Sequence, residues 1–219
     1  MLGFLGSTVG KKYIMGITGL IWAGFVLAHM AGNMLIFVSS DAYNSYGHAL
    51  TSGNIIYVAE VVLVLALISH VYTAVSLTIN NREAKQQRYA VNAKGLKKVS
   101  LASRTMAIQG SLILVFIILH IATFKYGTFY ETTVHGVAMR DLARLMDEVF
   151  AQPGYVVWYV VCLILLGFHL SHGVGSSFQS LGLMEGTYRN FWKKLSCAYA
   201  VIVALGFISQ PLYLLLSAH

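Results

Sequence analysis

Charged side chains are scarce in this sequence. They make up 11% of its 219 residues, whereas 57% are apolar and the mean hydropathy is +0.69. A soluble domain typically has about 25% charged and about 45–50% apolar residues. The composition therefore excludes an ordinary soluble protein and indicates an integral membrane protein.

Cysteine and proline are also scarce. The two cysteines, Cys162 and Cys197, lie in apolar runs, and they are too few to hold an iron–sulfur cluster, which needs four protein ligands. The sequence contains no C-x-x-C-H, so covalent haem attachment through that motif is excluded. Two prolines in the whole chain fit long, uninterrupted helices. We expect no cleavable signal peptide, because the first apolar run is long enough to remain as an anchor.

Five apolar runs approach the ~20 residues that a helix needs to cross a bilayer. They cover about 13–38, 55–79, 105–126, 155–179 and 195–217. We therefore expect residues 1–219 to form a single domain, an all-α integral membrane protein with a bundle of five transmembrane helices.

Basic residues predict how the bundle is oriented. The net charge is +7, and 12 of the 15 lysines and arginines would fall on one side of the membrane. Those on that side are Lys11, Lys12, Arg82, Lys85, Arg88, Lys94, Lys97, Lys98, Arg104, Arg189, Lys193 and Lys194. Short cytoplasmic loops are enriched in basic residues, so we expect a cytoplasmic N-terminus and an external C-terminus. The same rule explains the charge better than nucleic-acid binding does.

The predicted outer loop 127–154 contains VAMRDLARLMDEVF, in which apolar residues recur at helical spacing. They are Met139, Leu142, Leu145, Met146 and Val149. We predict a short amphipathic helix there, lying on the outer surface and capping the bundle.

Histidines lie deep inside four of the five runs, at His29, His70, His120 and the neighbouring His169 and His172. An ionisable side chain inside a bilayer is costly and marks a functional-site hypothesis. At a helical rise of ~1.5 Å per residue, His29 and His120 lie about 24 and 22 Å from the cytoplasmic edge. The same arithmetic places His70 and His169 about 14 and 15 Å from that edge. The histidines thus fall into two layers, separated by ~8–10 Å along the membrane normal.

Two haems, each held between two helices by a pair of histidines, would explain these layers. A different metal is disfavoured because no carboxylate or thiolate joins either layer. The alternative is that these are ordinary buried histidines, satisfied by backbone groups or hydroxyls. Small residues near the histidines would give a macrocycle room, or would simply allow close helix packing; they are Gly24, Ala28, Gly32, Gly167 and Gly173.

Several segments resemble the di-haem cytochrome b membrane anchor of bacterial succinate:quinone oxidoreductases, the complexes called succinate dehydrogenase or fumarate reductase. They are GFVLAHMAGN (24–33), NSYGHAL (44–50), YVAEVV (57–62), ISHVYTAV (68–75), ILH (118–120) and FHLSHGVGSSF (168–178). The resemblance extends from about Lys11 to Leu216. It implies a multi-pass protein of the bacterial inner membrane with five transmembrane helices and haem ligands on the first four.

The resemblance also implies the ligand sets and the partners. His70 and His169 would ligate a haem b near the cytoplasm, and His29 and His120 a second haem b near the outer face. A flavoprotein subunit and an iron–sulfur subunit would dock on the cytoplasmic side, and the quinone would be menaquinone. Some relatives carry an uncharged amide at the position of His172, so the resemblance assigns the ligand to His169. Depth alone does not separate the two, since three residues amount to ~4.5 Å.

Four further residues are candidates for quinone or propionate contacts. Glu60 is an acid well inside a span, about five residues from the outer end of that span. The resemblance implies that it forms a hydrogen bond with quinone or takes part in proton transfer. The alternative is that its carboxylate extends to the outer interface. His48 in the outer loop is a candidate for quinone or a haem propionate, or is solvated. His172 would contact a propionate or line a cavity. Arg104 would reach propionates of the inner haem, or serves only as a topology signal.

The expected function is electron relay between the cytoplasmic iron–sulfur subunit and membrane quinone, as the quinone-reacting subunit of a complex whose dicarboxylate chemistry lies on another subunit. One alternative is the cytochrome b anchor of a hydrogenase or formate dehydrogenase. Another, of a different class, is a haem-free membrane transporter that uses the same histidines.

Overall fold

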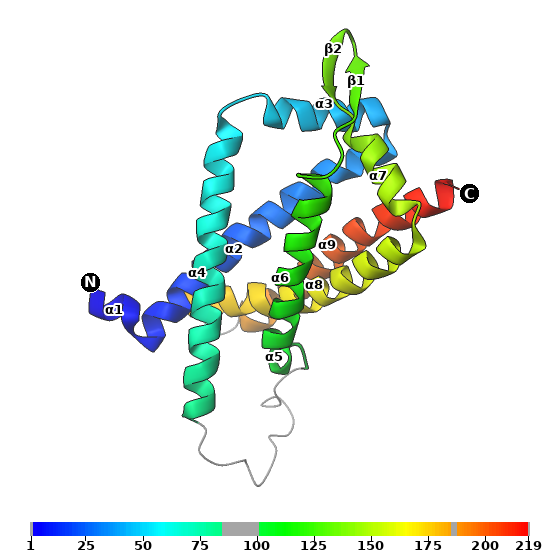
Figure 1. Cartoon of the computed structure of the whole chain (residues 1–219). Coiled ribbons are helices and arrows are strands. Elements are labelled where there is room, and N and C mark those ends of the chain that lie inside the picture. The colour runs from blue at the N-terminus through cyan, green and yellow to red at the C-terminus, as the bar shows by residue number, and fades with distance from the viewer. Residues whose placement is uncertain (1, 85–100, 185–187, 219) are drawn as a thin grey trace.

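The computed structural model describes residues 2–84, 101–184 and 188–218, and most of them are helical (Figure 1). Five helices are long and apolar enough to cross a membrane, as the sequence predicts. They are α2 (Thr8–Asn33), α4 (Ile55–Glu83), α6 (Met106–Phe124), α8 (Pro153–Ser180) and α9 (Arg189–Ser217). A 3-10 turn, η1 (Met34–Phe37), continues α2. The side of the membrane that each terminus faces stays a prediction. The basic residues of 85–100 lie outside the described residues.

Short elements connect the long helices. They are α1 (Leu2–Gly6), α3 (Ser40–Thr51), α5 (Leu101–Arg104), β1 (Glu131–Val134), β2 (Val137–Arg140) and α7 (Leu142–Phe150). In Figure 1, α3, the β1–β2 hairpin and α7 gather at one end of the molecule, and α3 contacts both β2 and α7. We call these three elements the cap. The sequence did not predict α3 or the hairpin.

The amphipathic helix predicted from 137–150 is wrong in its first part. Val137–Arg140 is a strand that pairs antiparallel with Glu131–Val134. His135 and Gly136 join the strands with φ angles of 50° and 80°, and two consecutive positive φ values make the tight reversal that suits the twist of a hairpin. The helix begins only after Asp141, whose side chain caps it by accepting from the Arg144 backbone N–H at 3.0 Å.

The core of the molecule lies along α8. This helix packs against α9, α2 and α6, and α2 packs in addition against α4. The apolar face of α7 joins the cap to this core. It presents three side chains that are at most 5% exposed and pack with residues of α8 and α9, namely Leu145, Met146 and Phe150. By contrast, most of the surface of α4 and α6 is open to the surroundings, as is expected of helices that face lipid or a partner.

Two pairs of long helices that carry facing histidines do not pack closely against each other. Within the described residues, α2 and α6 are not among the pairs whose backbones are in contact, and neither are α4 and α8. The pairs of long helices in contact are α8 with α9, α2 with α4, α2 with α8, α6 with α8, α2 with α9 and α4 with α6. The histidine side chains meet between α2 and α6 and between α4 and α8.

Candidate histidine-paired cofactor sites

His29 of α2 faces His120 of α6, with ring centroids 5.9 Å apart and ring planes at 80°. Aromatic rings surround the two imidazoles. Phe25 stacks on His29 at 5.4 Å with nearly parallel planes, and Phe207 of α9 lies 5.7 Å from it. Since this pair lies on the halves of α2 and α6 that lead into the cap, we call it the cap-side pair.

His120 has a hydrogen-bonding partner on a third helix. Its Nδ1 lies 3.1 Å from the hydroxyl of Tyr159 on α8. Tyr159 is 6% exposed, and its ring packs against Phe116 and Phe150, each with centroids 4.9 Å away. The phenol is therefore held between α6 and the cap.

His70 of α4 faces His169 of α8, with ring centroids 6.4 Å apart and ring planes at 62°. We call these residues the far-side pair. His70 Nδ1 lies 3.2 Å from Thr18 Oγ1 of α2. Because the Thr18 hydroxyl already donates to the Ile14 carbonyl at 2.8 Å, it is placed to accept from His70 Nδ1–H. That tautomer leaves a lone pair on His70 Nε2.

His169 has no such partner. Within the described part of the chain, its Nδ1 is buried and makes no hydrogen bond. An unsatisfied buried polar atom is costly and needs an explanation, such as a ligand. His169, rather than His172, makes the ring contact with His70; His172 lies one helical turn away and is partly buried.

Two glycines allow other helices to approach the far-side pair. A methyl group at Gly19 would lie 3.3 Å from His70 Cε1 and 3.2 Å from Ser177 Oγ. A methyl group at Gly110 would lie 3.7 Å from His169 Cε1. The sequence did not single out either glycine.

The small residues that the sequence did single out lie elsewhere. Gly24 and Gly173 have open space where a methyl group would stand, Gly32 packs against the ring of Tyr46, and Gly167 packs against Ala204. Gly32 and Gly167 therefore allow close packing, whereas the space beside Gly24 and Gly173 is open.

Three helices repeat the same spacing between the two pairs. Ten residues separate Gly19 from His29 on α2, Gly110 from His120 on α6, and Tyr159 from His169 on α8. Ten residues of α-helix measure about 15 Å. The two pairs are therefore about 15 Å apart along the helices, compared with the ~8–10 Å along the membrane normal that the sequence indicated.

The ring distances can be compared with those of two imidazoles on opposite sides of one metal ion. A metal–imidazole nitrogen bond is about 2.0–2.1 Å long and the ring centroid lies ~1.1 Å beyond the nitrogen, so the two centroids would be ~6.3 Å apart. Both pairs are within 0.4 Å of that value. In the described residues no group of three or more histidines, cysteines or carboxylates is placed to hold a metal. Two protein ligands are fewer than a bare ion such as zinc requires, and they suit an iron whose remaining ligands come from a macrocycle.

Glu60 is ion-paired. Its carboxylate lies 2.5 Å from the ammonium of Lys125, which follows the last residue of α6. The two side chains are 37% and 44% exposed, respectively. The pair links α4 to α6 on the cap side, and a partner of opposite charge explains how α4 tolerates an acid.

The remaining candidates lie on short elements, α3 and α5. His48 is partly buried in the last turn of α3, within the cap. Arg104 is the last residue of α5 and is exposed. Neither takes part in the ring contacts around the two histidine pairs in the part of the chain that the structure describes.

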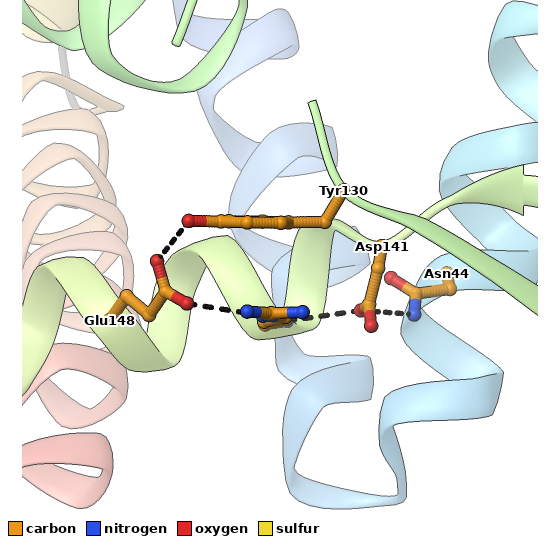
Figure 2. A network of polar contacts seen from close by, with 5 residues as sticks. Asn44, Tyr130, Asp141 and Glu148 are labelled. Carbon is orange, nitrogen blue, oxygen red and sulfur yellow. Dashed lines mark hydrogen bonds and ion pairs between the residues drawn. The ribbon is translucent and has the colours of Figure 1, made fainter. Parts of the chain in front are cut away.

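A polar network that the sequence did not predict holds the cap together (Figure 2). Asn44 of α3 is 2% exposed; its side chain donates to Asp141 at 2.8 Å and accepts from the Ala143 backbone N–H at 3.0 Å. Arg144 stacks 4.0 Å from the Tyr130 ring centroid and contacts Glu148 at 3.1 Å. These bonds join α3, the hairpin and α7.

The hydroxyl of Tyr130 completes this network by donating to Glu148 at 2.5 Å. That hydrogen bond raises the pKa of Tyr130 and lowers the pKa of Glu148. Burial alone raises the pKa of Tyr43, which lies in α3 beside Asn44, to about 12.

Comparison with family models, with curated proteins and with solved structures finds no match for this chain.

Proposed function

We propose that the protein is a di-haem cytochrome b membrane anchor, which relays electrons between an iron–sulfur subunit and a membrane quinone in a succinate:quinone or quinol:fumarate oxidoreductase. The observation that carries the proposal is the pairing of the histidines. Four intramembrane histidines from four helices form two facing pairs, with centroid distances of 5.9 and 6.4 Å. Both distances suit two axial ligands on one iron.

Each histidine pair would hold one haem b, which supplies reversible one-electron transfer when bound. His29 and His120 would ligate one iron, and His70 and His169 the other. The chain would tune the potential of the cap-side haem by burying it, because the phenylalanine rings around His29 and His120 exclude water and lower the local dielectric. In the described residues the backbones of α2 and α6 do not pack closely, and neither do those of α4 and α8, which would leave space for a flat group between them.

The remaining parts of the proposal rest on the resemblance noted in the sequence. The protein would lie in a bacterial inner membrane. Flavoprotein and iron–sulfur subunits would dock on the end opposite the cap, which carries seven of the ten lysines and arginines that the structure describes. Glu60, with Lys125, is the candidate for handling menaquinone and its protons near the cap. His48, His172 and Arg104 are candidates for propionate or quinone contacts.

The test is the haem content of the purified full-length protein in detergent. We expect two b-type haems per chain in a haemochrome assay. His29→Ala should remove one haem and His70→Ala the other, and the two variants should lose different absorption bands. His135→Ala, in the hairpin turn, is the matched control and should keep both. A wild-type protein without a Soret band would overturn the proposal.

The structure offers one argument for a haem-free alternative. His70 and His120 each have a hydroxyl within 3.2 Å of Nδ1, so neither needs a metal to satisfy that nitrogen. Both readings are compatible with this geometry, since a ligating histidine usually donates its other ring N–H to a neighbouring group. The same absorption spectrum decides between them. A nickel or molybdenum subunit that copurifies would instead indicate a hydrogenase or formate dehydrogenase anchor.

A further inference from the structure

Tyr159 is a buried phenol that has no part in the proposed ligand set. It sits in the middle of an aromatic cluster, and its only hydrogen bond in the described part of the chain joins it to His120. Buried tyrosine hydroxyls usually have a partner. Here the partner is a predicted axial ligand that belongs to a different helix.

The direction of this hydrogen bond determines which ring nitrogen of His120 is free. A neutral imidazole has one N–H and one lone pair. If the phenol donated to Nδ1, the proton of His120 would be on Nε2, and Nε2 would be unable to bind a metal. If the phenol accepts from Nδ1–H, the lone pair is on Nε2.

We propose that Tyr159 is the positioning residue of the cap-side site: its hydroxyl oxygen accepts from His120 Nδ1–H and thereby presents His120 Nε2 to the iron. This inference rests on the proposed function, because it assumes that His120 is an axial ligand. The oxygen also makes the imidazole a more basic ligand, as acceptors behind metal-bound histidines do.

The position of the phenol is maintained by its packing. The Tyr159 ring meets Phe116 of α6 and Phe150 of α7 at nearly perpendicular angles, 77° and 84°. Phe150 belongs to the cap and is 3% exposed. The cap therefore contributes to the site through Tyr159.

The far-side pair contains a comparable contact, which supplies an internal comparison. There the acceptor is the aliphatic hydroxyl of Thr18, whose own proton is engaged by Ile14. Each pair thus has one histidine with a hydroxyl behind Nδ1. The two hydroxyls come from different helices, so each can be removed without altering the other.

The experiment is a redox titration of the haem-loaded full-length protein with Tyr159→Phe, which removes the hydroxyl and keeps the ring. We expect the midpoint potential of one haem to rise, because a less basic ligand stabilises the oxidised iron less. A net hydrogen bond predicts about a five-fold change in the ratio of reduced to oxidised haem at a fixed potential. The affected haem must be the one that His29→Ala removes, and its low-spin electron paramagnetic resonance signal should shift.

Two control variants separate hydrogen bonding from packing. Phe150→Leu changes the packing of the Tyr159 ring and keeps its hydroxyl, so it should move the cap-side potential by less than Tyr159→Phe does and leave the other potential unchanged. Thr18→Val should shift the other haem and leave the cap-side haem unchanged. If Tyr159→Phe does not accumulate, 3-fluorotyrosine placed at position 159 weakens the oxygen as an acceptor and should raise the same potential.

Three results would overturn the inference: no shift, an equal shift of both haems, or a lowered potential of the cap-side haem, which is the opposite sign from that expected when an acceptor is lost. Loss of the cap-side haem alone in Tyr159→Phe, with both haems retained in Phe150→Leu, supports it. A wild-type protein that binds no haem would instead refute the proposed function. The two failures are therefore distinguishable.

Discussion

Gly19 permits the sharpest test of how closely α2 approaches the far-side pair. A methyl group there would stand 3.3 Å from His70 Cε1 and 3.2 Å from Ser177 Oγ, so Gly19→Ala requires these neighbours to move by a few tenths of an ångström. Overpacking of this kind costs about 1–3 kcal/mol, whereas replacing glycine by alanine within a helix contributes about 1 kcal/mol of stability. The net effect expected for Gly19→Ala is about 0–2 kcal/mol of destabilisation.

Gly24→Ala is the matched control, because Gly24 lies on the same helix with nothing within 4 Å of the added methyl group. It should stabilise the protein by about 1 kcal/mol. We would compare unfolding of both variants in the same detergent by circular dichroism, and record the absorption spectrum of each haem. Gly19→Ala should be the less stable of the two and should alter only the haem that His70→Ala removes. Equal stability with unchanged spectra would refute the close approach at Gly19.

Three further predictions concern the cap and the ion pair. Asn44→Ala removes a buried side chain that makes two hydrogen bonds and should destabilise the protein by about 2–3 kcal/mol, measured by thermal unfolding; an unchanged midpoint would show that the network does not hold the cap. Glu60→Gln should change the free energy of unfolding by less than about 1 kcal/mol, because the ion pair with Lys125 is partly exposed. Under the proposed function the same variant should lower quinone turnover. A variant with full turnover would show that Glu60 is not part of the quinone site. Protection of α7 amides from hydrogen exchange, taken relative to the intrinsic exchange rate at each pH, should be greatest between two limits. Glu148 has a pKa lowered from 4.5, so its contribution is lost as pH falls through that lowered pKa. Tyr130 has a pKa raised from 10.0, so its contribution is lost as pH rises through that raised pKa. In Tyr130→Phe the alkaline limit should disappear.

The hairpin illustrates why one local prediction failed. Apolar residues from Leu142 to Val149 do form a helical face, and Met139 matches that spacing by coincidence. The conformation of His135 and Gly136 reverses the chain, and positive φ values are uncommon outside glycine. A pattern of apolar residues does not reveal such a turn, so the strand was missed although the helix that follows it was predicted.

The sequence by itself determined the five apolar helices and the grouping of the histidines by depth. Both depend on local quantities, namely the length of an apolar run and the rise of a helix. It also indicated that the charge of Glu60 needs a reason, but it did not predict the ion pair with Lys125.

Only the tertiary structure decided which groups surround the histidine rings. Gly19, Tyr159 and Thr18 approach His70 or His120 from other helices, 39 to 52 residues away in the chain for the two hydroxyls. Their proximity depends on how α2, α4, α6 and α8 pack and rotate about their axes, and no single run of residues contains that information. The spacing of about 15 Å between the pairs likewise follows from helix register, which the uncertain helix ends concealed.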